Sequence, residues 1–181
     1  MNPKQAAEAT EGSAHGTELS LTSAAEVEPL VRARGSLFVV TDRHGNITPK
    51  GARDLGLFLM DTRFLSHLTL SVPGANLVHL TSNRSHDAYN QIDLMMAGAD
   101  GEFLDDPQNY FHLRRRQLLD DSFVEELTIT SYLGRPTALE LVFEFDADFA
   151  DIFEVRGAKR TSRGQRQPAA LARDWVTLSY R

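Results

Sequence analysis

The sequence has no cysteine and only one tryptophan among its 181 residues. Without cysteine the chain can form neither disulfides nor thiolate metal sites. No stretch approaches the roughly 20 consecutive apolar residues that a membrane-spanning helix needs. The N-terminal region also lacks the apolar run of about 7–15 residues that marks a secretory signal peptide. We therefore expect a soluble, cytoplasmic protein that does not enter a membrane.

Excess positive charge is lacking as well. The chain has 19 basic and 25 acidic residues, a formal net charge of -6 and a pI near 5.5. Such a protein repels phosphate backbones unless it gathers a concentrated basic face, and the sequence shows only short basic runs. A Ser/His/Asp set, a Gly-rich phosphate loop and an amphipathic membrane helix are missing too. We expect no nucleic-acid partner and no cofactor.

The chain divides into a tail and one domain. Residues 1–28 are rich in Ala, Glu, Thr, Ser and Gly without sustained periodicity. Because such a segment buries too little apolar surface to offset its ordering entropy, we interpret it as a mobile tail. Residues 29–181 have the size and composition of one domain with a hydrophobic core.

Short alternating runs separated by turns fill the first half of that domain. Residues 36–41 form a β-branched and aromatic run, and residues 42–46 have the composition of a tight turn. Residues 64–72 alternate between apolar and polar side chains, as a half-buried strand does. Turn residues follow at 73–76, so we predict that residues 77–82 pair back on the preceding strand as a hairpin.

The second half repeats the pattern with longer strands. Runs at 110–119, 123–132 and 137–147, joined by short turns, predict an antiparallel meander. Residues 158–170 are polar and basic, which favours an exposed loop. A last run at 175–180 stops at the end of the sequence, so we expect a sheet that is incomplete at its C-terminal edge. One face of the third run is predicted to be buried: Leu139, Leu141, Phe143, Phe145 and Ala147.

Many short strands and few helical windows predict a mainly β fold, an antiparallel β-sandwich. One exception is a short helical turn near residues 148–154. Phe149, Ile152 and Phe153 have helical spacing there, and Asp148 is placed to cap the turn.

Two segments, residues 56–66 (GLFLMDTRFLS) and residues 145–157 (FDADFADIFEVRG), resemble parts of a known family. In this order and at this separation they resemble the N-terminal domain of bacterial and archaeal glycogen debranching proteins of the amylo-α-1,6-glucosidase type. The resemblance covers roughly residues 30–181. It implies a β-supersandwich followed by an (α/α)6 barrel, and the glycosidase carboxylates belong to the barrel. It therefore implies a non-catalytic accessory domain, with no catalytic or metal-binding residues of its own. Its implied partners are that (α/α)6 catalytic domain and an α-glucan.

Charged residues in the two segments permit two interpretations. Asp61 and Arg63 lie just before a strand, where Asp caps a turn and Arg pairs with a nearby carboxylate. Alternatively, they contact a neighbouring domain or a glucan hydroxyl. We favour the structural interpretation, because partly buried charge pairs commonly fix registry.

Four carboxylates lie within nine residues of the second segment, and Arg156 follows them: Asp146, Asp148, Asp151 and Glu154. Glycoside hydrolysis needs two carboxylates about 5–10 Å apart, so a catalytic site is one interpretation. Because Asp is routine at strand ends and turns, and no further catalytic groups accompany the cluster, an interdomain or glucan contact by Asp148, Asp151, Glu154 and Arg156 is favoured.

Other residues permit weaker predictions. Tyr89 and Tyr110 are candidate sugar-stacking platforms, whereas Phe111 and Trp175 are assigned to the core. His67 and His79 are placed so that they can face each other across the first hairpin, but without a carboxylate they make a weak metal site, and we favour ordinary residues of the sheet surface. The run Arg114–Arg116 is expected to pair with acids on neighbouring strands, Glu125, Glu126, Glu140 or Glu144.

Three functions stay open from the sequence. The leading one is the accessory domain of a glycoside hydrolase. The alternative is a stand-alone carbohydrate-binding module that uses Tyr89 and Tyr110. An enzyme in its own right, using the carboxylates around Asp148, ranks last.

Overall fold

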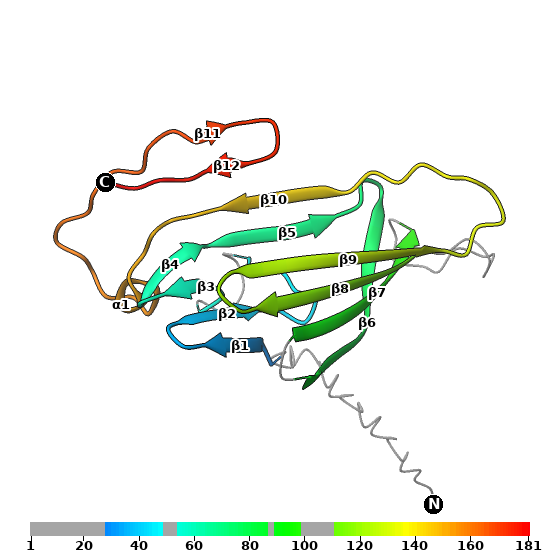
Figure 1. Ribbon diagram of the computed structural model, residues 1–181, viewed down its shortest axis with the longest axis horizontal. Coiled ribbons are helices and arrows are strands. Elements are labelled where there is room, and N and C mark those ends of the chain that lie inside the picture. The colour runs from blue at the N-terminus through cyan, green and yellow to red at the C-terminus, as the bar shows by residue number, and fades with distance from the viewer. Residues whose placement is uncertain (1–27, 49–53, 87–88, 99–110) are drawn as a thin grey trace, which may run out of the picture.

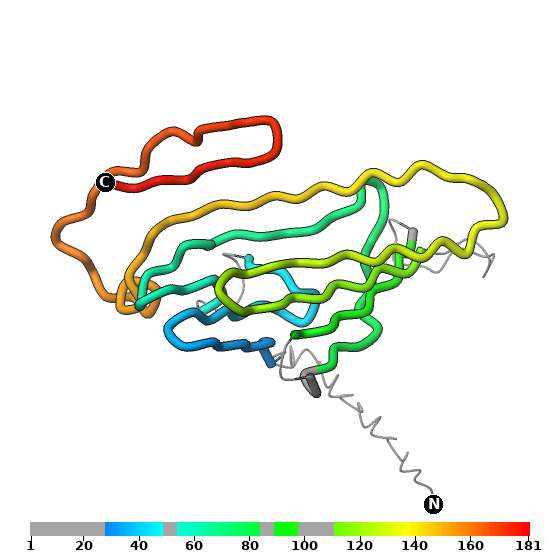
Figure 2. The backbone as a smooth tube through the Cα atoms, viewed as in Figure 1, coloured from blue at the N-terminus to red at the C-terminus, as the bar shows by residue number. Residues whose placement is uncertain are grey.

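The computed structural model describes residues 28–48, 54–86, 89–98 and 111–181 and shows an antiparallel β-sandwich (Figure 1). The mainly β fold class is therefore confirmed. Its only described helix, α1 (Ile152–Val155), is one turn long, as expected for residues 148–154. The C-terminal segment leaves the sandwich after α1 and returns along its upper side (Figure 2).

The first layer is a four-stranded sheet in the order β1-β2-β3-β4. Tight turns join its hairpins, and the residues at those turns, Gly35, Met60 and Asp61, have left-handed backbone conformations with φ of 59°, 46° and 64°. The strands are β1 (Leu30–Arg34), β2 (Leu37–Thr41), β3 (Gly56–Leu59) and β4 (Thr62–Leu65). β2 confirms the strand predicted at residues 36–41.

The second layer is a four-stranded sheet in the order β6-β7-β8-β9. Its strands are β6 (Ala75–His86), β7 (Tyr89–Gly98), β8 (Phe111–Leu119) and β9 (Phe123–Ser131). β8 and β9 pair in register from Phe111↔Ser131 to Leu119↔Phe123, which confirms the predicted hairpin. Two small pairs complete the fold: β5 (His67–Ser71) with β10 (Val142–Asp146), and β11 (Ala170–Leu171) with β12 (Val176–Thr177).

Apolar side chains from both layers meet in the core. The largest buried cluster joins residues of β1 and β5 to residues of β7 and β8: Leu30, Leu70, Ile92, Leu94, Phe111 and Leu113. Phe111 is 5% exposed, which confirms its assignment to the core. Burial of such side chains is the main stabilising contribution to a fold of this size.

The predicted hairpin between residues 64–72 and 77–82 is wrong. A turn does form, since the amide of Ala75 donates to the carbonyl of Val72 at 3.1 Å. Beyond it the strands diverge, because β5 pairs with β10 whereas β6 pairs with β7. The turn is a corner at which the chain changes layers.

The predicted meander ends after two strands. β10 does not pair with β9, because it crosses to β5 with Phe145↔Leu68 and Phe143↔Leu70 opposite each other. The predicted buried face holds for Ala147 at 1% exposure, but Phe143 and Phe145 are 43% and 45% exposed. The strand predicted at 175–180 shortens to β12, and Trp175 is 61% exposed, so its assignment to the core is also wrong.

Polar side chains of β8 connect the two layers through the core. The fully buried Arg115 donates from Nε to Glu125 at 2.5 Å and from Nη1 to the carbonyl of His44 at 2.7 Å. Gln117 donates to the carbonyl of Gly45 at 2.7 Å. Gly45 has a φ of 79°, and a Cβ there would meet Gln117 at 2.9 Å, so a glycine fits this turn. Arg115 therefore fixes the turn predicted at 42–46.

The Arg114–Arg116 run pairs with acids largely as predicted. Arg115 binds Glu125, and Arg116 lies 3.5 Å from Glu126. Arg114 differs, because its Nε donates to Asp93 of β7 at 2.8 Å. The neighbouring strand on that side supplies the acid.

His44 and His79 face each other, not His67 and His79. Their ring centroids lie 5.6 Å apart in an edge-to-face arrangement. The less favoured alternative, in which His67 faces His79, is excluded because β5 and β6 belong to different sheets. Burial lowers the pKa of His44 from its ordinary value of 6.5, with Asp42 opposing this effect and Arg43 adding to it. Burial, with Arg43, likewise lowers the pKa of His79.

The two lowered pKa values predict a loss of stability in mild acid. Well above pH 6.5 both rings are neutral in the folded and the unfolded chain. As the pH falls below that value the unfolded chain binds protons first, so the free energy of unfolding declines. Urea unfolding between pH 7 and 5 should show this decline, and His44→Gln should reduce it, because only His79 then contributes. An equal decline in the variant would contradict the assignment.

Candidate functional site

The two segments that carry the family resemblance lie against each other at one end of the sandwich. The amide of Arg63 donates to the carbonyl of Ala150, and the amide of Ile152 donates to the carbonyl of Asp61, both at 2.8 Å. Thr62 and Asp151 form an antiparallel bridge between these hydrogen bonds. Residues almost a hundred positions apart thus form a single local structure.

An apolar cluster holds this structure together. The ring of Phe58 in β3 is fully buried and packs with Ala150 and Val155. Phe38 stacks on it with the ring centroids 4.6 Å apart and the planes 6° from parallel. The first layer therefore carries α1 on its surface through Phe58.

Arg63 and Asp148 form a bidentate ion pair next to this cluster. Arg63 donates from Nη2 to Oδ2 at 2.5 Å and from Nε to Oδ1 at 3.1 Å, and its Nη1 donates to the carbonyl of Leu55. The side chains are 16% and 34% exposed. The expected pairing of Arg63 with a nearby carboxylate is therefore observed, whereas its contact with a neighbouring domain or a glucan stays a prediction.

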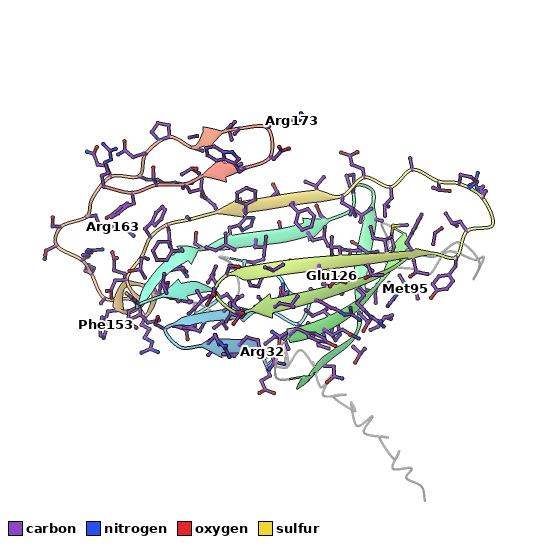
Figure 3. The ribbon with its side chains drawn as sticks, viewed as in Figure 1. Arg32, Met95, Glu126, Phe153, Arg163 and Arg173 are labelled. Atoms are coloured by element: carbon purple, nitrogen blue, oxygen red, sulfur yellow. The ribbon has the colours of Figure 1, made fainter. Side chains whose placement is uncertain are left out.

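Asp151, not Asp148, caps α1. Its side chain accepts from the amide of Phe153 at 2.7 Å, while Glu154 accepts from the amide of Asp151 at 3.0 Å, which is a capping box. Asp148 lies three residues before this N-cap, where its carboxylate binds Arg63 and accepts from the amide of Ala150 at 3.2 Å. Phe153 is 65% exposed and points away from the sandwich (Figure 3), so the predicted apolar side of the turn is only partly buried.

The basic segment after α1 folds back over the same carboxylates. Arg160 and Arg163 lie 3.3 and 3.0 Å from the Glu154 carboxylate. Arg166 forms an ion pair with Asp146, at the end of β10. Residues 158–170 are exposed as predicted, apart from half-buried Gln167. These ion pairs hold the segment against α1 and the end of β10.

Between these elements lies a cleft of about 860 Å³, which we call the charged cleft. Among the described residues, four basic and three acidic side chains line it. Its lining residues are Thr48, Leu55, Arg63, Ser66, His67, Asp146, Asp148, Ala150, Glu154, Val155, Ala158, Lys159, Arg160 and Arg163. Of these, sequence reasoning singled out Arg63 and the acids. It missed Arg160 and Arg163, although the basic run that contains them was visible.

The carboxylates in the cleft are engaged as hydrogen-bond acceptors. Arg63 binds Asp148, Arg166 binds Asp146, and two arginines bind Glu154. A glycosidase general acid must instead hold a proton to donate. In the described part of the chain, no group of three or more His, Asp or Glu side chains gathers as metal ligands do.

The other predicted residues lie apart from the cleft or at its margin. Asp61 is exposed in the β3–β4 turn, and Arg156 is exposed at the end of α1. Tyr89 is half-buried on β7, with the guanidinium of Arg116 over its ring at 5.6 Å. Tyr110 lies outside the described residues. Sugar stacking by these tyrosines stays a prediction.

Fold and cleft together define a β-sandwich domain with a mixed-charge cleft at one end. A comparison with known families matches residues 33–181 to the N-terminal domain of (some) glycogen debranching enzymes, and the chain belongs to that family. The match confirms the resemblance seen in the two segments. No curated protein matches the sequence. None of the described helices is long and apolar enough to cross a membrane.

Proposed function

We propose that this chain is a non-catalytic domain of a glycogen debranching enzyme that packs on the (α/α)6 catalytic part and shapes one wall of the glucan cleft. The observation that carries the proposal is an open inner face at β10. Phe143 and Phe145 lie directly opposite Leu70 and Leu68, so the four side chains share one face of the sheet.

The two sides of that face differ in burial. Leu70 and Leu68 are 4% and 8% exposed, whereas Phe143 and Phe145 are 43% and 45% exposed. Among the described residues β10 has β5 as its only strand neighbour, so its outer edge is also unpaired. Apolar side chains and open strand edges of this kind favour contact with another protein surface.

A second apolar surface lies on the β11–β12 hairpin, beside β10 (Figure 1). Leu171, Trp175 and Val176 are 77%, 61% and 41% exposed. The base of the hairpin is fixed, because Tyr180 stacks on Phe149 with the ring centroids 5.5 Å apart and bridges to Arg166. A hairpin with a fixed base and an exposed apolar tip is suited to binding another protein surface. Tryptophans often contribute most of the binding energy in protein–protein interfaces.

The proposal predicts a large effect of Trp175→Ala on association. Binding of the 181-residue chain to the separately produced catalytic part can be measured by sedimentation or calorimetry. Loss of a central tryptophan costs about 2 kcal/mol or more, which is roughly thirtyfold in Kd. Val31→Ala is the matched control, since Val31 is 50% exposed on β1, away from β10. Equal losses for the two variants, or no association, would reject the docking surface.

Activity gives an independent test. The longer protein should hydrolyse α-1,6-branched oligosaccharides, and the 181-residue chain alone should not, because its cleft carboxylates are bound by arginines. Hydrolysis by the isolated chain at the rate of the longer protein would overturn the accessory role.

The exposed Trp175 also supports the alternative, a carbohydrate-binding module, since aromatic faces stack on sugar rings. Trp175 is the only tryptophan in the chain, so its fluorescence reports directly on this site. Under the accessory proposal, maltoheptaose at millimolar concentration leaves the emission unchanged. A saturable change would favour the binding module.

A further inference from the structure

Lys159, Arg160 and Arg163, in the basic segment that closes the charged cleft, have no role in the proposed docking. From Arg156 to Arg173 the chain contains six basic residues and no acidic one, in a protein with a net charge of -6. Three of these cations line the cleft: Lys159, Arg160 and Arg163. Figure 3 shows Arg163 on the segment that leads from α1 to the hairpin, and Arg173 at the far tip of that hairpin.

The cleft retains positive charge after its internal ion pairs are formed. Asp148 is bound by Arg63, Glu154 by Arg160 and Arg163, and Asp146 by Arg166. Among the described residues, Lys159 has no acidic partner and is exposed at the cleft. Arg160 and Arg163 are 44% and 51% exposed, and each contacts Glu154 through one nitrogen, so they have further N–H groups to donate.

Exposed guanidinium and ammonium groups gathered in a cleft favour a phosphoryl group. A guanidinium group binds two phosphate oxygens in a bidentate geometry, and a lysine ammonium attracts the phosphate as a compact positive charge. The same cleft presents hydroxyl groups of Thr48 and Ser66 and the oxygens of Asp146 and Asp148. The hydroxyl and carboxylate oxygens of the cleft can accept hydrogen bonds from sugar hydroxyls. Inorganic phosphate has no sugar hydroxyls to donate them.

We propose that the charged cleft binds a sugar phosphate. The phosphoryl group lies against Lys159, Arg160 and Arg163, and the sugar hydroxyls face Asp146 and Asp148. The volume of about 860 Å³ lies within the range of small-molecule sites. Asp146 is the last residue of β10, but the cations that bind the phosphoryl group are not among the apolar residues proposed for docking, so different variants test the two proposals.

Calorimetric titration of the 181-residue chain tests the site. The probes are glucose 6-phosphate, inorganic phosphate and glucose, at low ionic strength and pH of about 7.5, where a phosphomonoester is mostly a dianion. We expect glucose 6-phosphate to bind most tightly, inorganic phosphate more weakly and glucose not measurably. Equal binding of glucose would reject phosphoryl recognition, and equal binding of inorganic phosphate would reject the contacts to the sugar. No binding of either phosphate would overturn the site.

Variants locate the binding. Lys159→Gln and Arg163→Gln should each weaken glucose 6-phosphate binding about tenfold, the effect of losing one charge-assisted hydrogen bond. Arg173→Gln removes the same charge at an exposed position outside the cleft and should leave the Kd unchanged. Circular dichroism and urea unfolding confirm that each variant is folded. An equal loss in Arg173→Gln would show diffuse charge attraction and would overturn the assignment.

Discussion

Arg115→Met should lower the free energy of unfolding by about 3–5 kcal/mol, which is the cost of breaking a buried ion pair by removing one partner. Arg115 is 0% exposed and Glu125 is 12% exposed, so the substitution leaves a carboxylate inside the sandwich without its cation. It also removes the donor to Asn46 Oδ1 at 2.6 Å. Urea unfolding followed by circular dichroism measures the change.

The adjacent residue provides the control. Arg116→Met removes an arginine from the same strand, but the Arg116–Glu126 pair is exposed by 35% and 53% at its two ends. Exposed pairs contribute about 0–1 kcal/mol, so this variant should unfold close to the parent midpoint. The double variant Arg115→Met, Glu125→Gln should recover part of the lost stability. Equal midpoints for the two single variants would contradict the buried connection between the layers.

Phe58→Ala should destabilise the domain by about 3–5 kcal/mol, the usual cost of truncating a buried phenylalanine. Its ring is 0% exposed and packs between Phe38 and the residues that hold α1. The cavity would loosen the contact between the two family segments as well as the core. Urea unfolding gives the stability, and hydrogen exchange of the Arg63 amide, which donates to Ala150, reports the contact.

Phe153→Ala removes a ring of the same size from α1. Because Phe153 is 65% exposed, we expect a change of about 0.5 kcal/mol or less. A comparable loss in both variants would mean that Phe58 does not hold the two segments together.

Local sequence signals predicted the strands well but predicted their partners poorly. The β8–β9 hairpin follows from two alternating runs and one short turn, and it is confirmed. The turn at Pro73–Asn76 gave the same signal, yet β5 and β6 enter different sheets there. Alternation fixes which side chains share a face, but it does not state which strand lies alongside. The partner of β10 is set by contacts some 75 residues away, as in Phe143↔Leu70.

At the candidate site the sequence supplied the residues but not their roles. Arg63 was expected to find a carboxylate, and it binds Asp148. Asp148 was predicted to cap the turn, but α1 begins later in the chain and Asp151 is its N-cap. The basic residues of segment 158–170 were recognised in the sequence. An irregular loop has no periodic pattern, however, so the sequence does not show which residues the loop contacts. Only the fold reveals that Arg160 reaches Glu154.

The open face of β10 and the β11–β12 tip explain why apolar residues were wrongly assigned to a closed core. Phe143, Phe145 and Trp175 have the pattern of buried residues, and all three are 43–61% exposed. Under the docking proposal these positions belong to an interface. The alternation of apolar residues along a strand is the same whether they face the interior of the domain or a surface that a partner covers.

Fluorescence of Trp175, the only tryptophan in the chain, tests the docking claim most directly. After the emission of the catalytic part alone is subtracted, addition of the separately produced catalytic part should shift the Trp175 emission to shorter wavelength and saturate at one equivalent, because the indole leaves water for an apolar contact. An unchanged emission maximum with the catalytic part present in excess would contradict the claim.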